Sequence, residues 1–228
     1  MPSDALIALS SACLAIAVSG MVTAVRQPAA RELRIRLAIL LGVFAALTAL
    51  PLIAAFAPGA YPLALPLGLP LLLIVSPAVH FFVTTRTGAA DPARLWRHAI
   101  LPIAGLSVAA GTWTLSATAR TTLFVEGELP PGAVPLLLVL ATFVLVLAWS
   151  AVSLGYLVAV LRRLHAYRAR LKDLFSNTHG RELRWLDVFM ALLASVWIAA
   201  AIAVLGDNLG GGVWISGEMI LGLTALML

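Results

Sequence analysis

Charge is scarce in this sequence. Only 11% of its 228 residues are Asp, Glu, Lys or Arg, whereas 62% are hydrophobic and the mean hydropathy is +1.04. A soluble domain is about a quarter charged and about half apolar. Because a chain of this length can bury a core with fewer apolar residues, the excess is expected to face lipid. The composition predicts an all-α, polytopic transmembrane helix bundle that forms a single domain over residues 1–228.

The sequence also lacks the motifs of common catalytic and metal sites. Its one cysteine, Cys13, cannot form an intramolecular disulfide, and a zinc site built on paired cysteines is excluded. No lysine-bearing phosphate loop, His-Glu-x-x-His or Gly-x-Ser-x-Gly motif is present. The four histidines are scattered along the chain. We therefore expect no enzyme, no metal site and no cofactor.

Long apolar segments recur along the chain. A helix needs roughly 20 apolar residues to cross a bilayer, and charge-poor stretches of about this length predict about seven spans. They cover residues 5–25, 37–56, 66–83, 99–119, 134–160, 186–205 and 214–228. No basic residue precedes the first stretch, which favours a span over a cleaved signal peptide. The last stretch is short for a span, so we expect native chain beyond Leu228, with a naturally short helix as the alternative.

The basic residues fall on one side of the predicted membrane. Of the 15 Lys and Arg residues, 14 lie in the loops after the first, third and fifth spans, and the exception is Arg120. Cytoplasmic loops retain Lys and Arg. This distribution predicts an N-terminus outside the cytoplasm and a C-terminus inside. It also accounts for the net charge of +5 without nucleic acid as a partner.

Residues 161–186 are the least lipid-like stretch. Leu161, Leu164 and Leu171 recur at helical spacing, and Ser176 or Asn177 is expected to break the helix. We predict a cytoplasmic amphipathic helical hairpin that leads into the sixth span. Its basic side chains are expected to contact anionic lipid headgroups. These are Arg162, Arg163, Arg168, Arg170 and Lys172.

Two ionisable residues lie within predicted spans, where such groups are costly. His80 belongs to the third span and Glu218 to the last. Each is a candidate ligand contact. The alternatives are a hydrogen-bonded helix contact for His80 and an interfacial carboxyl for Glu218. Proline in a span bends the helix, so Pro70 and Pro77, near one face of the third span, are able to frame a cavity.

Two stretches of the sequence carry a resemblance to a known family. The first is residues 73–87 followed by 95–102, with Ser76-Pro77 near its start and His98 before Pro102. The second is residues 167–176, ending in Phe175-Ser176, followed by 183–186 with Trp185. Together they resemble the membrane-embedded N-terminal region of bacterial AraC-type transcription regulators. The first stretch departs from that family, since Ser76 replaces a glycine and Pro102 lies one residue later than expected.

The resemblance implies a sensory or regulatory module in the bacterial inner membrane. Such a module couples a ligand or membrane signal to a cytoplasmic C-terminal DNA-binding domain, which this chain lacks. Phe175, Ser176 and Trp185 would pass the signal on. DNA would be a partner only through that missing domain. Other expected partners are the lipid bilayer, a second copy of the chain or other membrane proteins.

Two other functions remain open from the sequence. Small residues such as Ala194 and Ser195 allow close helix packing, which suits an accessory or structural subunit of a larger membrane complex. Glu218 would suit a small transporter, although the chain shows no inverted repeat of the usual transporter kind.

Overall fold

The computed structural model describes residues 3–26, 31–87 and 95–174, together with the single positions 191 and 195. The predicted spans 186–205 and 214–228 lie outside these residues, apart from those two positions. The second half of the 161–186 hairpin also lies outside them. So do Glu218, Phe175, Ser176 and Trp185.

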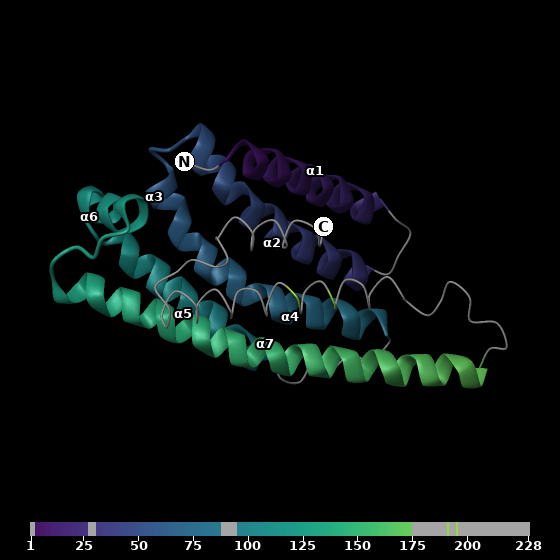
Figure 1. Cartoon of the computed structure of the whole chain (residues 1–228). Helices are drawn as coiled ribbons and strands as arrows, with labels where there is room; N and C mark the ends of the chain where they lie inside the picture. Colours follow the sequence, from purple (N-terminus) through teal and green to yellow (C-terminus); the bar gives the residue numbers. More distant parts are fainter. Residues whose placement is uncertain (1–2, 27–30, 88–94, 175–190, 192–194, 196–228) are drawn as a thin grey trace.

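Helices make up the regular structure of the described residues (Figure 1). In chain order they are α1 (Asp4–Arg26), α2 (Arg31–Phe56), α3 (Tyr61–Ala64), the 3₁₀-helix η1 (Leu65–Leu67), α4 (Gly68–Arg86), α5 (Leu95–Trp113), α6 (Ala117–Thr121), the π-helix η3 (Thr122–Glu126) and α7 (Ala133–Leu174). The predicted all-α class is confirmed for this part of the chain.

Four helical segments are long and apolar enough to cross a membrane. They are Asp4–Arg26, Arg31–Phe56, Tyr61–Arg86 and Ala133–Tyr167. Each overlaps one of the predicted spans. The fifth long helix, α5, has 19 residues and is not among the four. Its first turn carries Arg97 and His98, which lower its hydropathy.

The long helices pack side by side in an antiparallel bundle (Figure 1). α1 packs on α2, α2 on α4, and α7 on both α4 and α5, which also contact each other. The alternating directions bring the basic termini of the helices to one end of the bundle, which we call the basic end. Its described residues are Arg26, Arg31, Arg34, Arg36, Arg86, Arg97, Arg162 and Arg163.

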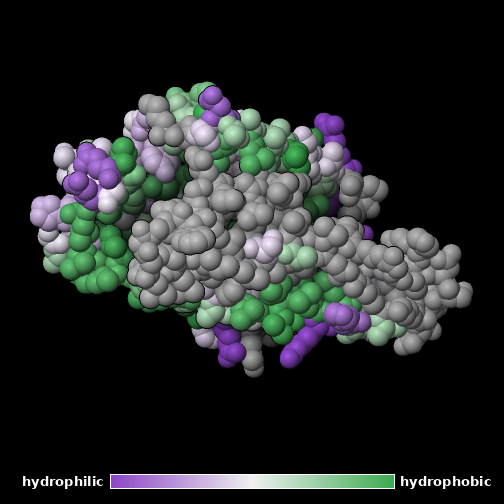
Figure 2. Space-filling view, viewed as in Figure 1, coloured by the Kyte–Doolittle hydropathy of each residue, from purple (hydrophilic) through white to green (hydrophobic). Residues whose placement is uncertain are grey.

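The core is apolar and centres on α4. Side chains from α2, α4 and α7 form one buried cluster: Leu40, Val43, Phe44, Val75, Ala78, Val79, Phe82, Val83, Val160 and Leu164. Many large apolar side chains outside it are exposed, including Leu137 (63%) and Val144 (60%) on α7. Figure 2 shows mainly hydrophobic side chains on the exposed surface over α1. Such surfaces suit helices whose outer faces contact lipid.

The predicted span 99–119 is not one continuous helix. α5 begins earlier, at Leu95, and ends at Trp113. A second helix then starts after Ser116, whose hydroxyl accepts a hydrogen bond from the Ala119 N–H at 3.1 Å. Serine is a favoured N-cap because its side-chain oxygen satisfies an N–H that the helix leaves free. This cap separates α6 from α5.

Arg120, the exception to the basic distribution, stabilises that break. Its guanidinium Nη1 donates to the carbonyl oxygens of Trp113 at 2.9 Å and Leu115 at 2.7 Å. The last carbonyls of a helix lack partners within the helix and carry the negative end of its dipole. A local capping role therefore explains a cation at the end opposite to the other basic residues.

α7 is longer than the predicted span 134–160. It runs without interruption for 42 residues, or about 63 Å at the usual helical rise. That exceeds a bilayer core of about 30 Å. Leu164 is buried and Arg162 and His165 are exposed. α7 thus continues past the predicted span as a helix with a buried and an exposed side over residues 161–167, and the cytoplasmic hairpin stays a prediction.

Candidate functional site

A cavity lies between α4, α5 and α7. Its volume is about 240 Å³, and it is partly open. Each of the three helices contributes a short stretch of side chains to the wall. The lining residues are Leu73, Ser76 and Pro77 from α4, Arg97, His98, Ile100 and Leu101 from α5, and Trp149, Val152 and Tyr156 from α7.

Pro77 is the proline that shapes this wall. It lies inside α4, whereas Pro70 falls in the first turn of that helix, where proline causes no loss of a helical hydrogen bond. Pro77 has no N–H to donate to the carbonyl of Leu73, one turn earlier. Both residues line the cavity. Of the two predicted helix-bending prolines, only Pro77 therefore acts within the helix.

A buried hydrogen bond closes α4 against α7 beside the cavity. The hydroxyl oxygens of Ser76 and Ser153 lie 2.6 Å apart, and both side chains are buried. A hydrogen bond between membrane helices contributes about 0.6–2 kcal/mol. The Ser76 hydroxyl is thus engaged in helix packing.

Trp149 brings an unpaired donor to the wall. Its indole Nε1 is buried and has no hydrogen-bond partner within the described part of the chain. A buried donor without an acceptor costs about 1–3 kcal/mol. This cost lies within the packing of the described helices, because the atom is shielded from the cavity as well as from solvent.

An aromatic cluster borders the cavity on the side of the basic end. It consists of His80, Phe81, His98 and Tyr156, from three helices. The His98 ring centroid lies 4.8 Å from that of Phe81, 5.5 Å from that of Tyr156 and 5.8 Å from that of His80. Nδ1 of His98 is hydrogen-bonded to the Tyr156 hydroxyl. His98 and Tyr156 belong to both the aromatic cluster and the cavity wall. A displacement of either side chain would therefore alter the cluster and the cavity together.

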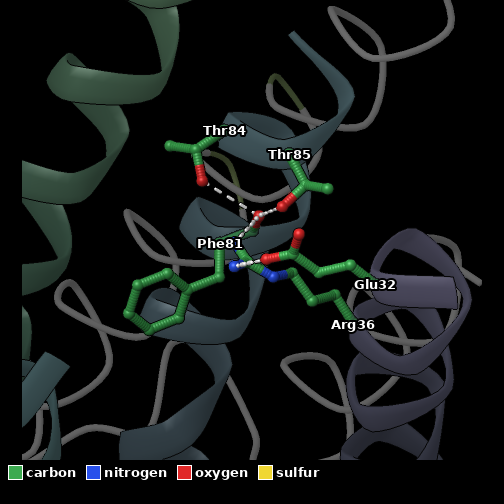
Figure 3. A network of polar contacts seen from close by, with 5 residues as sticks. All are labelled: Glu32, Arg36, Phe81, Thr84 and Thr85. Atoms are coloured by element: carbon green, nitrogen blue, oxygen red, sulfur yellow. Dashed lines mark hydrogen bonds and ion pairs between the residues drawn. The ribbon is translucent and has the colours of Figure 1, made fainter. Parts of the chain in front are cut away.

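The backbone of Phe81 also ties α4 to α2 (Figure 3). Arg36 Nη1 donates to the Phe81 carbonyl oxygen at 3.0 Å, and the hydroxyls of Thr84 and Thr85 donate to the same oxygen at 3.0 Å each. Arg36 also pairs with Glu32, one turn earlier. Its guanidinium carbon lies 5.5 Å from the Phe81 ring centroid. Contacts therefore run from α2 through Phe81 and His98 to α7.

The structure places one of the predicted ligand contacts, His80, in the aromatic cluster. His80 is absent from the residues that line the cavity. Its Nδ1 atom is buried and lacks a hydrogen-bond partner among the described residues. The expected hydrogen bond from His80 to another helix is therefore not found for this atom.

Of the predicted lipid-contacting residues, the structure describes two side chains. Arg162 is exposed and Arg163 is partly exposed on α7. The side chains of Arg168, Arg170 and Lys172 lie outside the described residues. Their contact with lipid remains a prediction.

None of the residues that line the cavity was predicted as a ligand contact or a signal-coupling residue. Arg97 is expected in a loop but lies in the first turn of α5. Trp149, Ser153 and Tyr156 follow one another at spacings of four and three, which places them on one face of α7. Val160 and Leu164 continue that face and are buried. This stripe of polar and aromatic residues is the sequence signal that marks the inward face of α7.

The site is suited to non-covalent binding. In the described ranges no three His, Cys, Asp or Glu residues form a group that could hold a metal ion. The described side chains that line the cavity are apolar or carry donors, and none is a carboxylate. This arrangement is able to hold and orient a small molecule within the bundle.

Comparisons with known proteins identified no protein similar to this chain. No family model matches the chain, and neither the curated proteins nor the solved structures contain a significant match to it.

Proposed function

We propose that this protein is a sensory or regulatory membrane module of a bacterial transcription regulator. The observation that carries the proposal is the continuity of α7. This one helix forms a wall of the cavity at Trp149, Val152 and Tyr156 and then runs on to Leu174. The resemblance of residues 73–87, 95–102, 167–176 and 183–186 to AraC-type regulators supports the same function.

α7 is able to transmit a change from the cavity over a long distance. From Trp149 to Leu174 it rises about 38 Å. Val160 and Leu164 hold this part of the helix in the core with α2 and α4. Packed cores switch between discrete arrangements, and helix shifts of about 1–2 Å are a common form of such switching. A ligand acts on this equilibrium only through different affinities for the two arrangements.

The proposal includes a topology. The basic end lies in the cytoplasm of a bacterial inner membrane, the N-terminus lies outside and about seven spans cross the bilayer. The basic clustering of Arg26, Arg36 and Arg86 at one end supports this orientation. The 161–186 hairpin then passes the signal through Phe175, Ser176 and Trp185 to a DNA-binding domain.

Distance measurements test the coupling. Spin labels at Arg26→Cys and His165→Cys, both exposed positions, report the position of α7 in a Cys13→Ala background. Leu101→Trp fills the cavity, and Leu137→Trp on the exposed face of α7 is the matched control. We expect the first to shift the distance distribution and the second to leave it unchanged. Identical distributions in all three proteins would rule out coupling through α7.

The intact mass of the protein from its own cells tests the regulator itself. We expect a mass above 23.9 kDa by about the size of a DNA-binding domain. A mass near 23.9 kDa would contradict the regulator. A stoichiometric partner in the same preparation would then identify an accessory subunit instead.

A further inference from the structure

We propose that the cavity between α4, α5 and α7 binds a small anionic amphiphile, with its apolar chain between the helices and its anionic head on Arg97. This inference deepens the proposed function and rests on it, because the amphiphile would be the signal that the module senses. The argument has three parts, which concern the size of the cavity, the charge of its wall and its orientation.

The size of the cavity limits the ligand. A cavity of about 150 Å³ holds benzene, which has six carbon atoms. By the same ratio, 240 Å³ holds about ten non-hydrogen atoms. Sites for drug-sized ligands start at about 300 Å³. The cavity therefore suits one short chain and its head, and it is too small for a two-chain phospholipid.

The chemistry of the wall selects the charge of the ligand. Leu73, Ile100, Leu101 and Val152 form an apolar surface, and none of the described lining residues is a carboxylate. Such a wall offers nothing to neutralise a cationic ligand.

The Arg97 guanidinium in the wall favours an anion. The Arg97 guanidinium forms no ion pair with any described carboxylate, and its carbon lies 5.6 Å from the Trp96 ring centroid. Guanidinium groups bind carboxylates and phosphates through two parallel hydrogen bonds.

The wall also orients the ligand. Arg97 is exposed in the first turn of α5, at the basic end, and Leu101 lies one turn further along the helix. An arginine near a helix end extends its head towards the membrane surface. The ligand would therefore place its head at the surface and its chain inward, which is the orientation of the lipids in that leaflet. Entry from the bilayer needs no reversal of the molecule.

Equilibrium binding of radiolabelled octanoate to the full chain in phosphatidylcholine nanodiscs tests this proposal. Octanoate has eight carbons, the last of which is the carboxylate carbon, and its roughly ten non-hydrogen atoms match the size limit. We expect saturable binding that octylamine does not displace. Arg97→Gln should weaken the binding at least tenfold, since a charge-assisted hydrogen bond is lost, whereas Arg97→Lys keeps the charge and should weaken it less. Arg162→Gln removes an exposed arginine outside the wall and should change nothing.

Three outcomes separate the possibilities. Absence of saturable binding, or equal losses in Arg97→Gln and Arg162→Gln, would overturn the proposal. Displacement of octanoate by phosphatidylglycerol in the nanodisc would contradict the size limit and overturn the proposal as stated. Octanoate binding that phosphatidylglycerol leaves unchanged supports a site for a free, one-chain anionic amphiphile. Octanoate that binds without shifting the spin-label distances would contradict the proposed function while the binding site stands.

Discussion

The hydroxyl of Tyr156 connects the cavity wall to the aromatic cluster through its hydrogen bond to His98. Two other polar atoms in this region, Trp149 Nε1 and His80 Nδ1, are buried without partners in the described part of the chain. Polar groups with a hydrogen-bond partner and polar groups without one thus occur in the same region of the described bundle. Single substitutions are able to measure what each contributes to stability.

Tyr156→Phe removes the hydroxyl and keeps the ring. Because this removes the hydrogen bond between the Tyr156 hydroxyl and His98 Nδ1 in a low-dielectric site, we expect a loss of about 1–2 kcal/mol in the free energy of unfolding. Thermal unfolding in detergent measures it. Tyr61→Phe is the control, since no described residue bonds to the Tyr61 hydroxyl. Equal effects of the two changes would show that the His98 contact contributes nothing.

The hydrogen bond between Ser76 and Ser153 is open to a double-mutant cycle. Each serine changed to alanine alone leaves its partner unpaired, and the double change removes both groups. We expect an interaction energy of about 0.6–1.7 kcal/mol between the two sites. Chemical unfolding of the four proteins provides it. Strict additivity would mean that the 2.6 Å contact does not stabilise α4 against α7.

At the scale of the helix, close approach between α4 and α5 depends on one glycine. A Cβ atom at Gly105 would lie 2.5 Å from Leu73 Cδ1 and 3.2 Å from the Pro70 Cα atom. The Leu73 side chain can rotate away, but the backbone of α4 must move. This contact fixes the two helices that form one side of the cavity.

Gly105→Ala should therefore lower the melting temperature of the protein by several degrees. Gly155→Ala is the matched control, because no atom lies within 4 Å of a Cβ atom built on Gly155. That change should leave the melting temperature the same or raise it, since alanine favours the helix. A loss in Gly155→Ala as large as in Gly105→Ala would exclude close packing as the cause.

For the whole molecule, the basic end is the basis of the orientation that we propose in the membrane. Single cysteines at Arg26, Glu128 and Arg162, all exposed, sample both ends of the bundle in a Cys13→Ala background. In intact cells an impermeant maleimide should label Glu128→Cys alone. The other two should react only after permeabilisation. Labelling of Arg26→Cys from outside would invert the proposed topology.

Much of the bundle follows from sequence patterns that are local. Four of the predicted spans correspond to the helical segments that are able to cross a membrane, because twenty apolar residues have few stable alternatives in lipid. The break after α5 was missed. Hydropathy does not register the cap that Ser116 provides, since its stabilisation comes from one side-chain oxygen.

The site was predicted only in part, because its residues meet across helices. The resemblance marks residues 73–87 and 95–102, and seven of the lining residues fall within them. The face of α7 that carries Trp149 and Tyr156 repeats at helical spacing. Nothing in that spacing shows which helices it packs against. Whether α7 contacts His80 and His98 depends on how each helix is rotated about its own axis. That rotation is determined by the packing of side chains that are far apart in the sequence.

The sequence by itself determined that the chain forms apolar helices and that its basic residues are concentrated in every second loop. Both properties depend on residues within one segment. Only the tertiary structure decided that α4, α5 and α7 enclose a cavity with Arg97 at the basic end. The approach of Gly105 to Pro70 and the bond between Ser76 and Ser153 set the positions of these helices. Such contacts join residues far apart in the chain, and their geometry is specified by packing between helices.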